Sequence, residues 1–297
     1  MTRLIAIQRP IRELGSLVRF SHTLFALPFA IFGGALAAHD ADGWHLRARD
    51  WLGILLAMVT ARSAAMAFNR LADRHIDALN PRTASRHLPA GRLSARTVAI
   101  FTVACSALFL ASTLLFLPRN PWPSILGVPV LLWLLAYSYT KRFTSLAHFW
   151  LGASLALAPI AAWVAIRGDL AWPPFWLGLA VLCWVAGFDI IYACQDADFD
   201  RAHQMRSVPA RLGVKGALRV AAGCHLLMLG ALVGLALAYP LGRTYQVGVA
   251  VVAALLIYEH TLVRPDDLGR VNQAFFHVNI VISMGLLAIG VADLIFS

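Results

Sequence analysis

Apolar stretches long enough to cross a lipid bilayer recur along almost the whole chain of 297 residues. A membrane-spanning helix needs about 20 apolar residues in succession, and the breaks between these stretches carry the Pro, Gly and charged residues typical of loops. The chain is 60% hydrophobic and only 13% charged, unlike a soluble domain. We therefore predict an all-α membrane bundle with nine transmembrane helices, at about 20–38, 51–72, 97–117, 122–140, 145–166, 172–195, 216–238, 244–263 and 274–296.

The net charge of +10 is distributed unevenly over the loops between these stretches. With the N-terminus in the cytoplasm, eighteen Lys and Arg residues fall in cytoplasmic segments and five fall on the opposite side. This excess is typical of cytoplasmic loops, so we expect no nucleic acid partner. We predict a multi-pass protein of the bacterial inner (cytoplasmic) membrane, with a cytoplasmic N-terminus and a site that opens to the cytoplasm.

Two acidic motifs stand 123 residues apart in this apolar chain. In each, a polar residue and two aspartates recur at every fourth position, so the three side chains lie on one side of a helix. Carboxylates near membrane depth are costly and mark a functional site; the alternative is that they cap helices or pair with basic loops. Two facing aspartate pairs would bind Mg²⁺, which commonly shares its coordination with substrate phosphates. The motif residues are Asn69, Asp73 and Asp77, and Tyr192, Asp196 and Asp200.

Similar segments follow the two motifs. Arg86-His-Leu-Pro-Ala comes after the first motif and Arg206-Ser-Val-Pro-Ala after the second, with the two arginines 120 residues apart. Internal repeats are common in membrane proteins, and their sites lie where the repeats meet. We predict one transmembrane domain over residues 1–297, with a first half of about 1–140 and a second half of about 141–297.

Basic residues close to the motifs can complete an electrostatic clamp on a diphosphate, and arginine offers bidentate contacts to its oxygens. The candidates for this clamp are Arg82, Arg86, Lys141, Arg142 and Arg206. Arg62 lies in the middle of an apolar stretch, where a permanent charge must have a partner. Asp189, within another apolar stretch, is one such partner.

In these residues the chain resembles the UbiA-type intramembrane aromatic prenyltransferases. The motifs N-x-x-x-D-x-x-x-D and Y-x-x-x-D-x-x-x-D carry the resemblance, with Arg62 seven residues before Asn69 and Asp189 seven residues before Asp196. The loop from Arg82 to Gly91 and the Y-x-x-x-K-R segment that ends at Arg142 also match. The likeness extends over nearly the whole chain.

The resemblance implies Mg²⁺-dependent transfer of a polyprenyl group from polyprenyl diphosphate to an aromatic acid, with release of diphosphate. The prenyl chain would extend sideways into membrane lipid. Arg62 would bind the carboxylate of the acid, and Asp189 would orient its hydroxyl or stabilise the cationic ring. The implied Mg²⁺ ligands are Asp73, Asp77, Asp196 and Asp200, with Asn69 as a further donor, while Tyr192 hydrogen-bonds nearby.

Two aromatic acceptors fit this family. The broader expectation is 4-hydroxybenzoate, for ubiquinone synthesis. The stretch from Ser21 to Pro28 and the pair Asn69-Arg70 are more similar to the subgroup of the futalosine-type menaquinone route, whose acceptor is 1,4-dihydroxy-6-naphthoate. We favour the second acceptor. Outside prenyl transfer, a cation transporter also fits intramembrane aspartates and an internal repeat, but it leaves the basic clamp unexplained.

Overall fold

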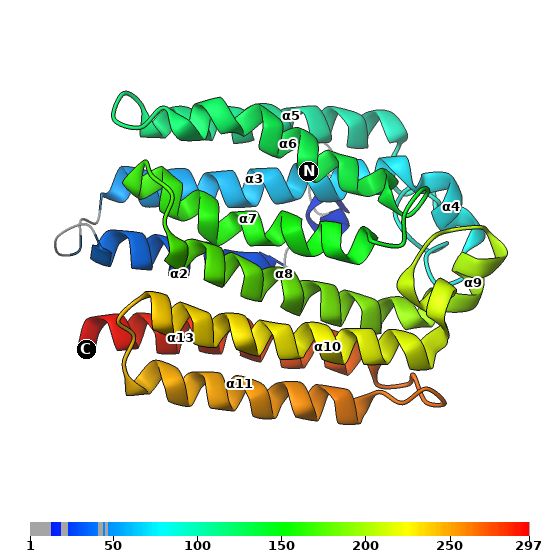
Figure 1. Ribbon diagram of the computed structural model, residues 1–297. Helices are drawn as coiled ribbons and strands as arrows, with labels where there is room; N and C mark the ends of the chain where they lie inside the picture. The colour runs from blue at the N-terminus through cyan, green and yellow to red at the C-terminus, as the bar shows by residue number, and fades with distance from the viewer. Residues whose placement is uncertain (1–12, 19–22, 41–43, 45–46, 297) are drawn as a thin grey trace, which may run out of the picture. The chain divides into compact units, whose positions relative to one another are not determined.

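The structure, a computed structural model, describes residues 13–18, 23–40, 44 and 47–296. Within these residues the regular structure is helical, apart from one isolated β-bridge between Arg264 and Asp267 (Figure 1). The predicted all-α class is therefore confirmed.

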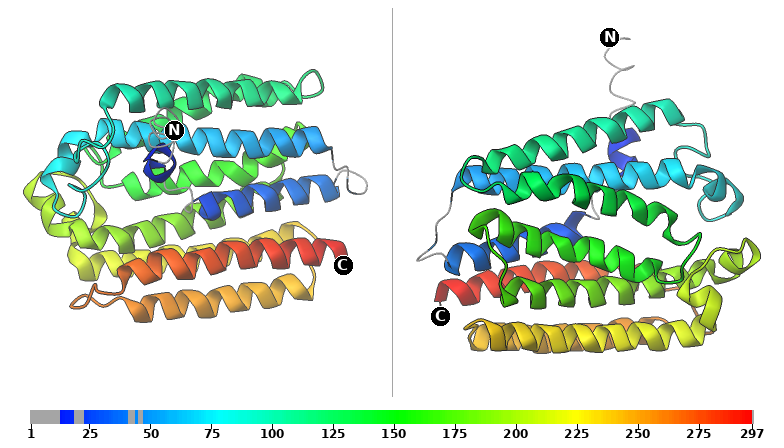
Figure 2. Two further views of the ribbon diagram at one scale, coloured as in Figure 1. Left: turned by 180° about the vertical axis from the view of Figure 1, so that it is seen from behind. Right: turned by 45° about the horizontal axis from the view of Figure 1, so that its top comes forward.

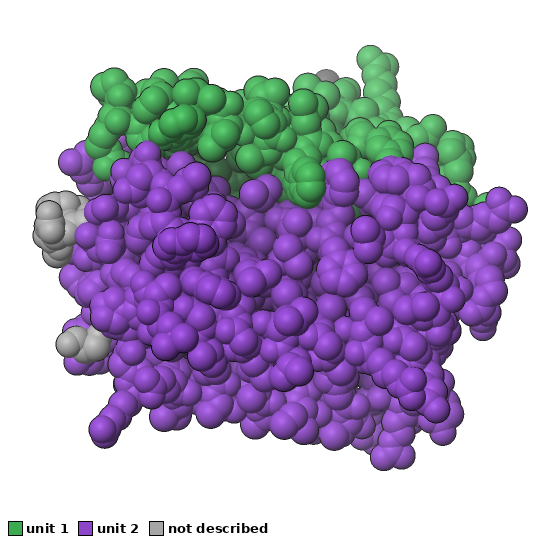
Figure 3. Space-filling model, in the orientation of Figure 1, with its two compact units in different colours: residues 1–23, 51–139 green, residues 24–50, 140–297 purple. Residues whose placement is uncertain are grey.

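The chain divides into two compact units, which Figure 3 distinguishes by colour. Unit 1 contains residues 1–23 and 51–139, and unit 2 contains residues 24–50 and 140–297. The first aspartate motif thus belongs to unit 1 and the second to unit 2. A single domain built as an internal repeat stays a prediction.

Unit 1 is based on three long helices (Figures 1 and 2). Apart from the end residues of α3 and α6, its elements are α3 (Ala48–Ala72), α4 (Arg74–Leu79), α5 (Ala95–Thr113), η2 (Leu114–Phe116) and α6 (Trp122–Thr140). Ala61 and Ala64 of α3 pack with Phe109 of α5 and Leu131 of α6. Such small side chains let helix backbones approach closely in a membrane protein. This packing holds α3, which leads directly into the first aspartate motif.

Unit 2 is arranged around α8, which is the most buried of the candidate membrane spans in the described residues. Its elements are α2 (Thr23–Asp40), α7 (Ala147–Arg167), α8 (Trp172–Ala193), η3 (Cys194–Asp196), α9 (Ala197–Ala202), α10 (Val208–Ala238), α11 (Arg243–Leu262), α12 (Val271–Gln273), η4 (Ala274–Val278) and α13 (Asn279–Phe296). α8 packs against both α7 and α10, and α11 packs against α10 and α13. Because α8 is apolar on all sides, burial between two neighbours suits it. It positions both Asp189 and the second aspartate motif.

Eight helices of the described residues are long and apolar enough to cross a membrane. They correspond to the second through ninth predicted spans. The first predicted span, 20–38, falls on α2, whose apolar part Phe25–Asp40 is shorter than the others, and residues 20–22 lie outside the described residues. The count of nine spans therefore stays a prediction, while the membrane-helical character of the chain is clear.

Gly152 lies where α7 packs closely on α8, and its replacement by alanine should destabilise unit 2. A Cβ atom at this position would collide with the backbone carbonyl oxygen of Leu182, so the helices must separate. We expect Gly152→Ala to cost about 1–3 kcal/mol of folding free energy, the usual effect of overpacking. Thermal unfolding in detergent measures it. Gly223→Ala on α10 is the matched control, because its added Cβ meets nothing within 4 Å; equal melting temperatures of the two variants would contradict the prediction.

Candidate active site

The first aspartate motif lies where α3 ends and the short helix α4 begins. Asp73 is the residue between the two helices, with φ −95° and ψ 5°, in the sparsely populated bridge region where many active-site residues are found. The side-chain amide of Asn69 donates to Asp73 Oδ2 at 2.9 Å. The expectation of one unbroken helix is wrong here, because α3 ends at Ala72 and α4 begins at Arg74. The Asp77 N–H still bonds to the Asp73 carbonyl at 2.8 Å, which keeps the two carboxylates one turn apart.

Asp77 is a buried carboxylate that is paired with an arginine. Arg86 Nη1 donates to Asp77 Oδ1 at 2.6 Å, and the Thr83 hydroxyl donates to the Asp77 backbone carbonyl at 2.9 Å. Asp77 Oδ2 is buried and has no hydrogen-bond partner among the described residues. One oxygen of this carboxylate is thus fixed by arginine while the other is available to a ligand.

A basic cavity of about 150 Å³ adjoins Arg86 in unit 1. Its lining residues are Ser16, Leu17, Arg70, Arg82, Ser85, Arg86, His87 and Arg92. Four guanidinium groups around so small a space favour an anion, and the size suits a phosphate group. Both predicted clamp residues of the first half, Arg82 and Arg86, lie in this lining.

The second motif repeats the backbone geometry of the first within unit 2. α8 ends at Ala193, the 3-10 turn η3 follows, and Asp196 precedes the short helix α9 with φ −105° and ψ 6°. α9 has six residues, as α4 has, and Asp200 occupies the same position in it as Asp77 in α4. The two motifs therefore share one local design, which supports the predicted repeat.

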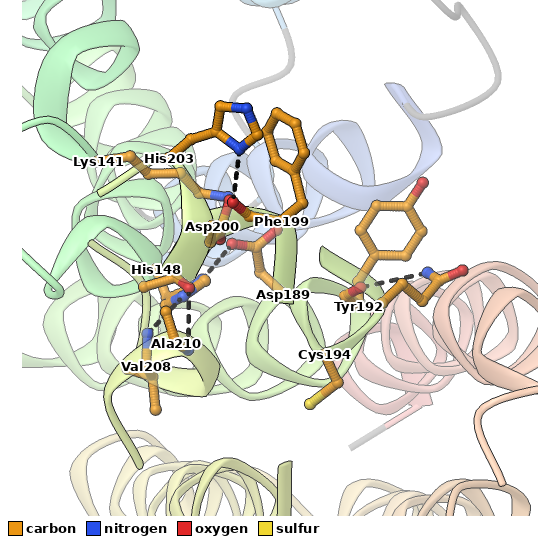
Figure 4. A network of polar contacts seen from close by, with 12 residues as sticks. Lys141, His148, Asp189, Tyr192, Cys194, Phe199, Asp200, His203, Val208 and Ala210 are labelled. Atoms are coloured by element: carbon orange, nitrogen blue, oxygen red, sulfur yellow. Dashed lines mark hydrogen bonds and ion pairs between the residues drawn. The ribbon is translucent and has the colours of Figure 1, made fainter. Parts of the chain in front are cut away.

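Asp200 is also buried beside a single base. Lys141 Nζ lies 3.9 Å from Asp200 Oδ2, and this oxygen has no hydrogen-bond partner in the part of the chain that the structure describes (Figure 4). Asp198, between the two motif aspartates, is by contrast fully exposed and pairs with Arg201 at 3.1 Å. Of the three acidic residues in this motif, Asp196 and Asp200 are buried and Asp198 faces solvent.

Arg206, the counterpart of Arg86, makes different contacts. Its backbone N–H donates to the Lys141 carbonyl at 2.7 Å, and its Nη1 donates to the Phe143 carbonyl at 2.6 Å. The loop after α9 is thereby fastened to the loop that carries Lys141 and Arg142. In unit 2, Lys141 rather than Arg206 is the base next to the buried aspartate.

Of the remaining predicted residues, Arg62 and Asp189 lie within their helices and Tyr192 lies close to the end of α8. Arg62 is in the middle of α3, and its buried Nε has no hydrogen-bond partner among residues 13–18, 23–40, 44 and 47–296. The ring of Tyr192 packs on that of Phe275, with 4.3 Å between centroids. Asp189 Oδ2 lies 2.6 Å from His148 Nδ1. His148 is a functional candidate that sequence reasoning missed, since a lone histidine 41 residues from Asp189 gives no local signal.

Comparison with known proteins identifies the family. The sequence model of the UbiA prenyltransferase family matches residues 26–281 of the chain. The chain belongs to the UbiA prenyltransferase family. The resemblance seen in the sequence and the prediction of a prenyltransferase are thus confirmed.

Several relatives support the UbiA assignment over most of the chain. The 4-hydroxybenzoate octaprenyltransferase of Vibrio vulnificus is 31% identical over 283 residues, covering 94% of this chain and 94% of that protein. The protein of the same name from Pectobacterium atrosepticum is 32% identical over 279 residues, covering 92% of this chain and 88% of its own. The apo structure of a UbiA homologue from Aeropyrum pernix K1 superposes with a TM-score of 0.81 at 35% identity, covering 92% of this chain and 98% of that one.

A more distant UbiA homologue, from Archaeoglobus fulgidus, has the same fold. Its structure with GPP and Mg²⁺ bound gives a TM-score of 0.73 at 20% identity, covering 95% of this chain and 99% of that one.

A divalent cation such as Mg²⁺ needs oxygen donors that are not already bonded within the protein. No group of three or more His, Cys, Asp or Glu side chains that could hold a metal occurs within the described part of the chain. The four motif aspartates are divided between the two units. Each unit nevertheless offers a buried carboxylate oxygen without a hydrogen-bond partner in the described residues, on Asp77 and on Asp200. Unpartnered carboxylate oxygens are the donors that Mg²⁺ prefers, so the residues fit the ion.

A larger cavity, of about 580 Å³, lies at the other end of unit 2. It is lined by His39, Asp40, Trp163, Ala171, Trp172, Pro173, Ala238, Tyr239 and Pro240. Burial, with a smaller contribution from Asp40, raises the pKa of Tyr239 to about 12. Because this lining contains an aspartate and neither Lys nor Arg, the cavity does not suit a diphosphate. It also adjoins the N-terminal end of α8, about 30 Å along the helix from the aspartate motif.

Proposed function

We propose that the chain transfers a polyprenyl group from polyprenyl diphosphate to an aromatic acid in a Mg²⁺-dependent reaction. The observation that carries the proposal is the matched pair of buried aspartates, Asp77 beside Arg86 and Asp200 beside Lys141, each with an unpartnered oxygen. The A. fulgidus homologue, bound to GPP and Mg²⁺, and relatives named 4-hydroxybenzoate octaprenyltransferase support it. Family membership favours this enzyme over a cation transporter.

In this proposal the aspartates bind Mg²⁺ and the basic residues bind the diphosphate directly. Asp73, Asp77, Asp196 and Asp200, with Asn69 as a further donor, would hold Mg²⁺, which when bound stabilises the charge of the leaving diphosphate. The basic residues of both halves bind the remaining phosphate oxygens. These residues are Arg82, Arg86, Lys141, Arg142 and Arg206. Together they favour breakage of the bond between the prenyl C1 and the diphosphate oxygen.

Arg62 and Asp189 are proposed to serve the aromatic acceptor, while Tyr192 hydrogen-bonds near the proposed Mg²⁺ ligands. Arg62 has an unpartnered Nε in the middle of α3 and can bind a carboxylate. Asp189 can accept the hydrogen bond of a ring hydroxyl, which makes the ring more nucleophilic. The ring carbon then bonds to the prenyl C1 and loses its proton, which restores aromaticity. Apolar helices exclude water, so that the allylic cation is not hydrolysed.

We propose 1,4-dihydroxy-6-naphthoate as the acceptor and 4-hydroxybenzoate as the alternative. Arg70, which lines the basic cavity, and the stretch from Ser21 to Pro28 favour the first; the names of the relatives favour the second. Ser21 and His22 lie outside the described residues. Both acceptors carry one carboxylate for Arg62 and a hydroxyl for Asp189.

We further propose that the protein lies in the bacterial inner membrane with the N-terminus and both aspartate motifs on the cytoplasmic side, and that the prenyl chain extends into lipid. The excess of basic residues in the loops on that side supports this orientation. Arg3, Arg9, Arg12 and Arg19, which contribute to the excess, lie outside the described residues.

Membranes that contain the protein should convert all-trans polyprenyl diphosphate and an aromatic acid into a prenylated product when Mg²⁺ is present. A panel of acids that includes dihydroxynaphthoate and hydroxybenzoate is the assay, with product and released diphosphate both measured. We expect the naphthoate to give the higher kcat/KM. Preference for hydroxybenzoate would overturn the choice of acceptor, and intact diphosphate with every acid would overturn the enzyme proposal.

A further inference from the structure

His148 occupies a fully buried position between two parts of unit 2. It is the second residue of α7, and its side chain is not exposed at all. Its Nδ1 lies 2.6 Å from Asp189 Oδ2 on α8, and its Nε2 accepts a hydrogen bond from the Val208 N–H at 3.4 Å (Figure 4). Both ring nitrogens therefore have partners inside the protein.

These two partners determine the tautomer of the imidazole. A backbone N–H can only donate, so Nε2 must act as the acceptor and carry no proton. The remaining ring proton is then on Nδ1, which donates to the Asp189 carboxylate. His148 is thus neutral, and its hydrogen bond to Asp189 is charge-assisted.

The same geometry excludes two other roles for His148. Its buried ring cannot reach a substrate directly, and its only lone pair is occupied by the Val208 N–H, so it is not the base. The aspartate is the member of the pair with access, because 16% of its side chain is exposed. Oδ2 is held by His148, which leaves Oδ1 to face a ligand.

The segment that bonds to His148 Nε2 follows the second aspartate motif in the chain. Val208 begins α10, directly after Ser207, whose hydroxyl caps that helix by accepting from the Ala210 N–H. The preceding residue, Arg206, is bonded to the Lys141 and Phe143 carbonyls. The orientation of Asp189 is therefore coupled to the loop that follows Asp200.

We propose that His148 is a positioning residue that holds the Asp189 carboxylate in a fixed orientation, so that Oδ1 accepts the hydrogen bond from the hydroxyl of the aromatic acceptor. The inference rests on the proposed function. During transfer the C–O bond to diphosphate breaks and the ring-to-prenyl C–C bond forms, while the hydroxyl keeps its proton and its hydrogen bond to Asp189 Oδ1 strengthens as electron density moves into the ring. The ring carbon then gives up its proton to water or to the released diphosphate, which restores aromaticity. His148 keeps its own proton throughout.

Two substitutions of His148 separate positioning from simple packing. His148→Leu keeps an apolar volume and removes the donor, whereas the amide nitrogen of His148→Asn can stand where Nδ1 stands and still donate to Asp189. We expect His148→Leu to lower kcat by about 10²-fold, with the KM for prenyl diphosphate within about twofold of the parent protein. His148→Asn should recover kcat to within about fivefold of the parent.

The matched control is His225→Asn, which replaces another buried histidine of unit 2 whose Nδ1 pairs with His260 instead. This control variant should leave kcat and the KM for prenyl diphosphate near the parent values. The positioning role is overturned if His148→Leu retains the parent kcat, if His148→Asn is as impaired as His148→Leu, or if the KM for prenyl diphosphate rises in step with the loss of kcat.

A binding measurement separates this proposal from the proposed function. Equilibrium binding of the aromatic acids to the purified protein in EDTA requires neither Mg²⁺ nor turnover. We expect His148→Leu to bind the acid about tenfold more weakly than the parent. If the parent binds an acid but transfers no prenyl group, the proposed function fails while this comparison still tests His148. Equal binding by the parent and His148→Leu overturns the positioning role, as does a parent protein that binds no acid.

Discussion

Replacing Asp200 with asparagine should abolish prenyl transfer, with a loss of about 10³-fold or more in kcat/KM. The change keeps the size and shape of the side chain and removes the negative charge beside Lys141. Oδ2 of this buried carboxylate has no hydrogen-bond partner within the described chain and lies 3.9 Å from Lys141 Nζ, so it can still accept a cation as a ligand. Prenyl transfer by purified protein over a range of Mg²⁺ concentrations measures the effect.

The control for Asp200→Asn is Asp198→Asn, two residues earlier in the same motif. Asp198 is fully exposed and pairs only with neighbouring Arg201 in the contacts described here, so its charge contributes little to a buried site. This variant should keep activity within about twofold of the parent. If Asp200→Asn stays folded by thermal unfolding and retains activity, or if both variants lose activity equally, Asp200 is not a metal ligand.

The spans and the aspartate motifs could be predicted from the sequence because each depends on a local pattern. Bilayer thickness fixes the length of an apolar helix, which places α3 and α8 to within a few residues. Spacing by four also places Asp73 and Asp77 one turn apart. The break at Asp73 could not be predicted, since the spacing by four favours a continuous helix while the backbone of Asp73 has φ −95° and ψ 5°.

Contacts between distant segments could not be predicted from the sequence. The predicted equivalence of Arg86 and Arg206 holds for their place after each motif, yet Arg206 bonds to backbone carbonyls while Lys141 lies beside Asp200. The bond between His148 and Asp189 joins α7 to α8 and depends on how these helices pack. No periodicity within either helix encodes it.

Arg62 should decide the affinity for the aromatic acid, and Arg62→Gln should lower kcat/KM for that acid by about 10²-fold. A charge-assisted, bidentate contact to the carboxylate is lost, whereas the KM for prenyl diphosphate should change little. Arg62→Lys keeps the charge but not the planar guanidinium group, so its kcat/KM for the acid should lie between those of the parent and Arg62→Gln. Steady-state kinetics with each substrate varied in turn give these constants, and Arg96→Gln, at an exposed position of α5, controls for loss of positive charge.

A change in the substrate tests whether Arg62 meets the carboxylate itself. The methyl ester of the acid lacks the charge, so the parent protein should discriminate strongly between acid and ester while Arg62→Gln should treat them almost alike. Such non-additivity is expected only when the two altered groups interact. If Arg62→Gln still prefers the acid as strongly as the parent does, Arg62 has a structural partner in the helix bundle, and another group binds the carboxylate. Arg62 Nε has no hydrogen-bond partner in the described residues, whereas a structural arginine in an apolar span would have all its donors satisfied. We therefore expect the preference for the acid to be lost in Arg62→Gln.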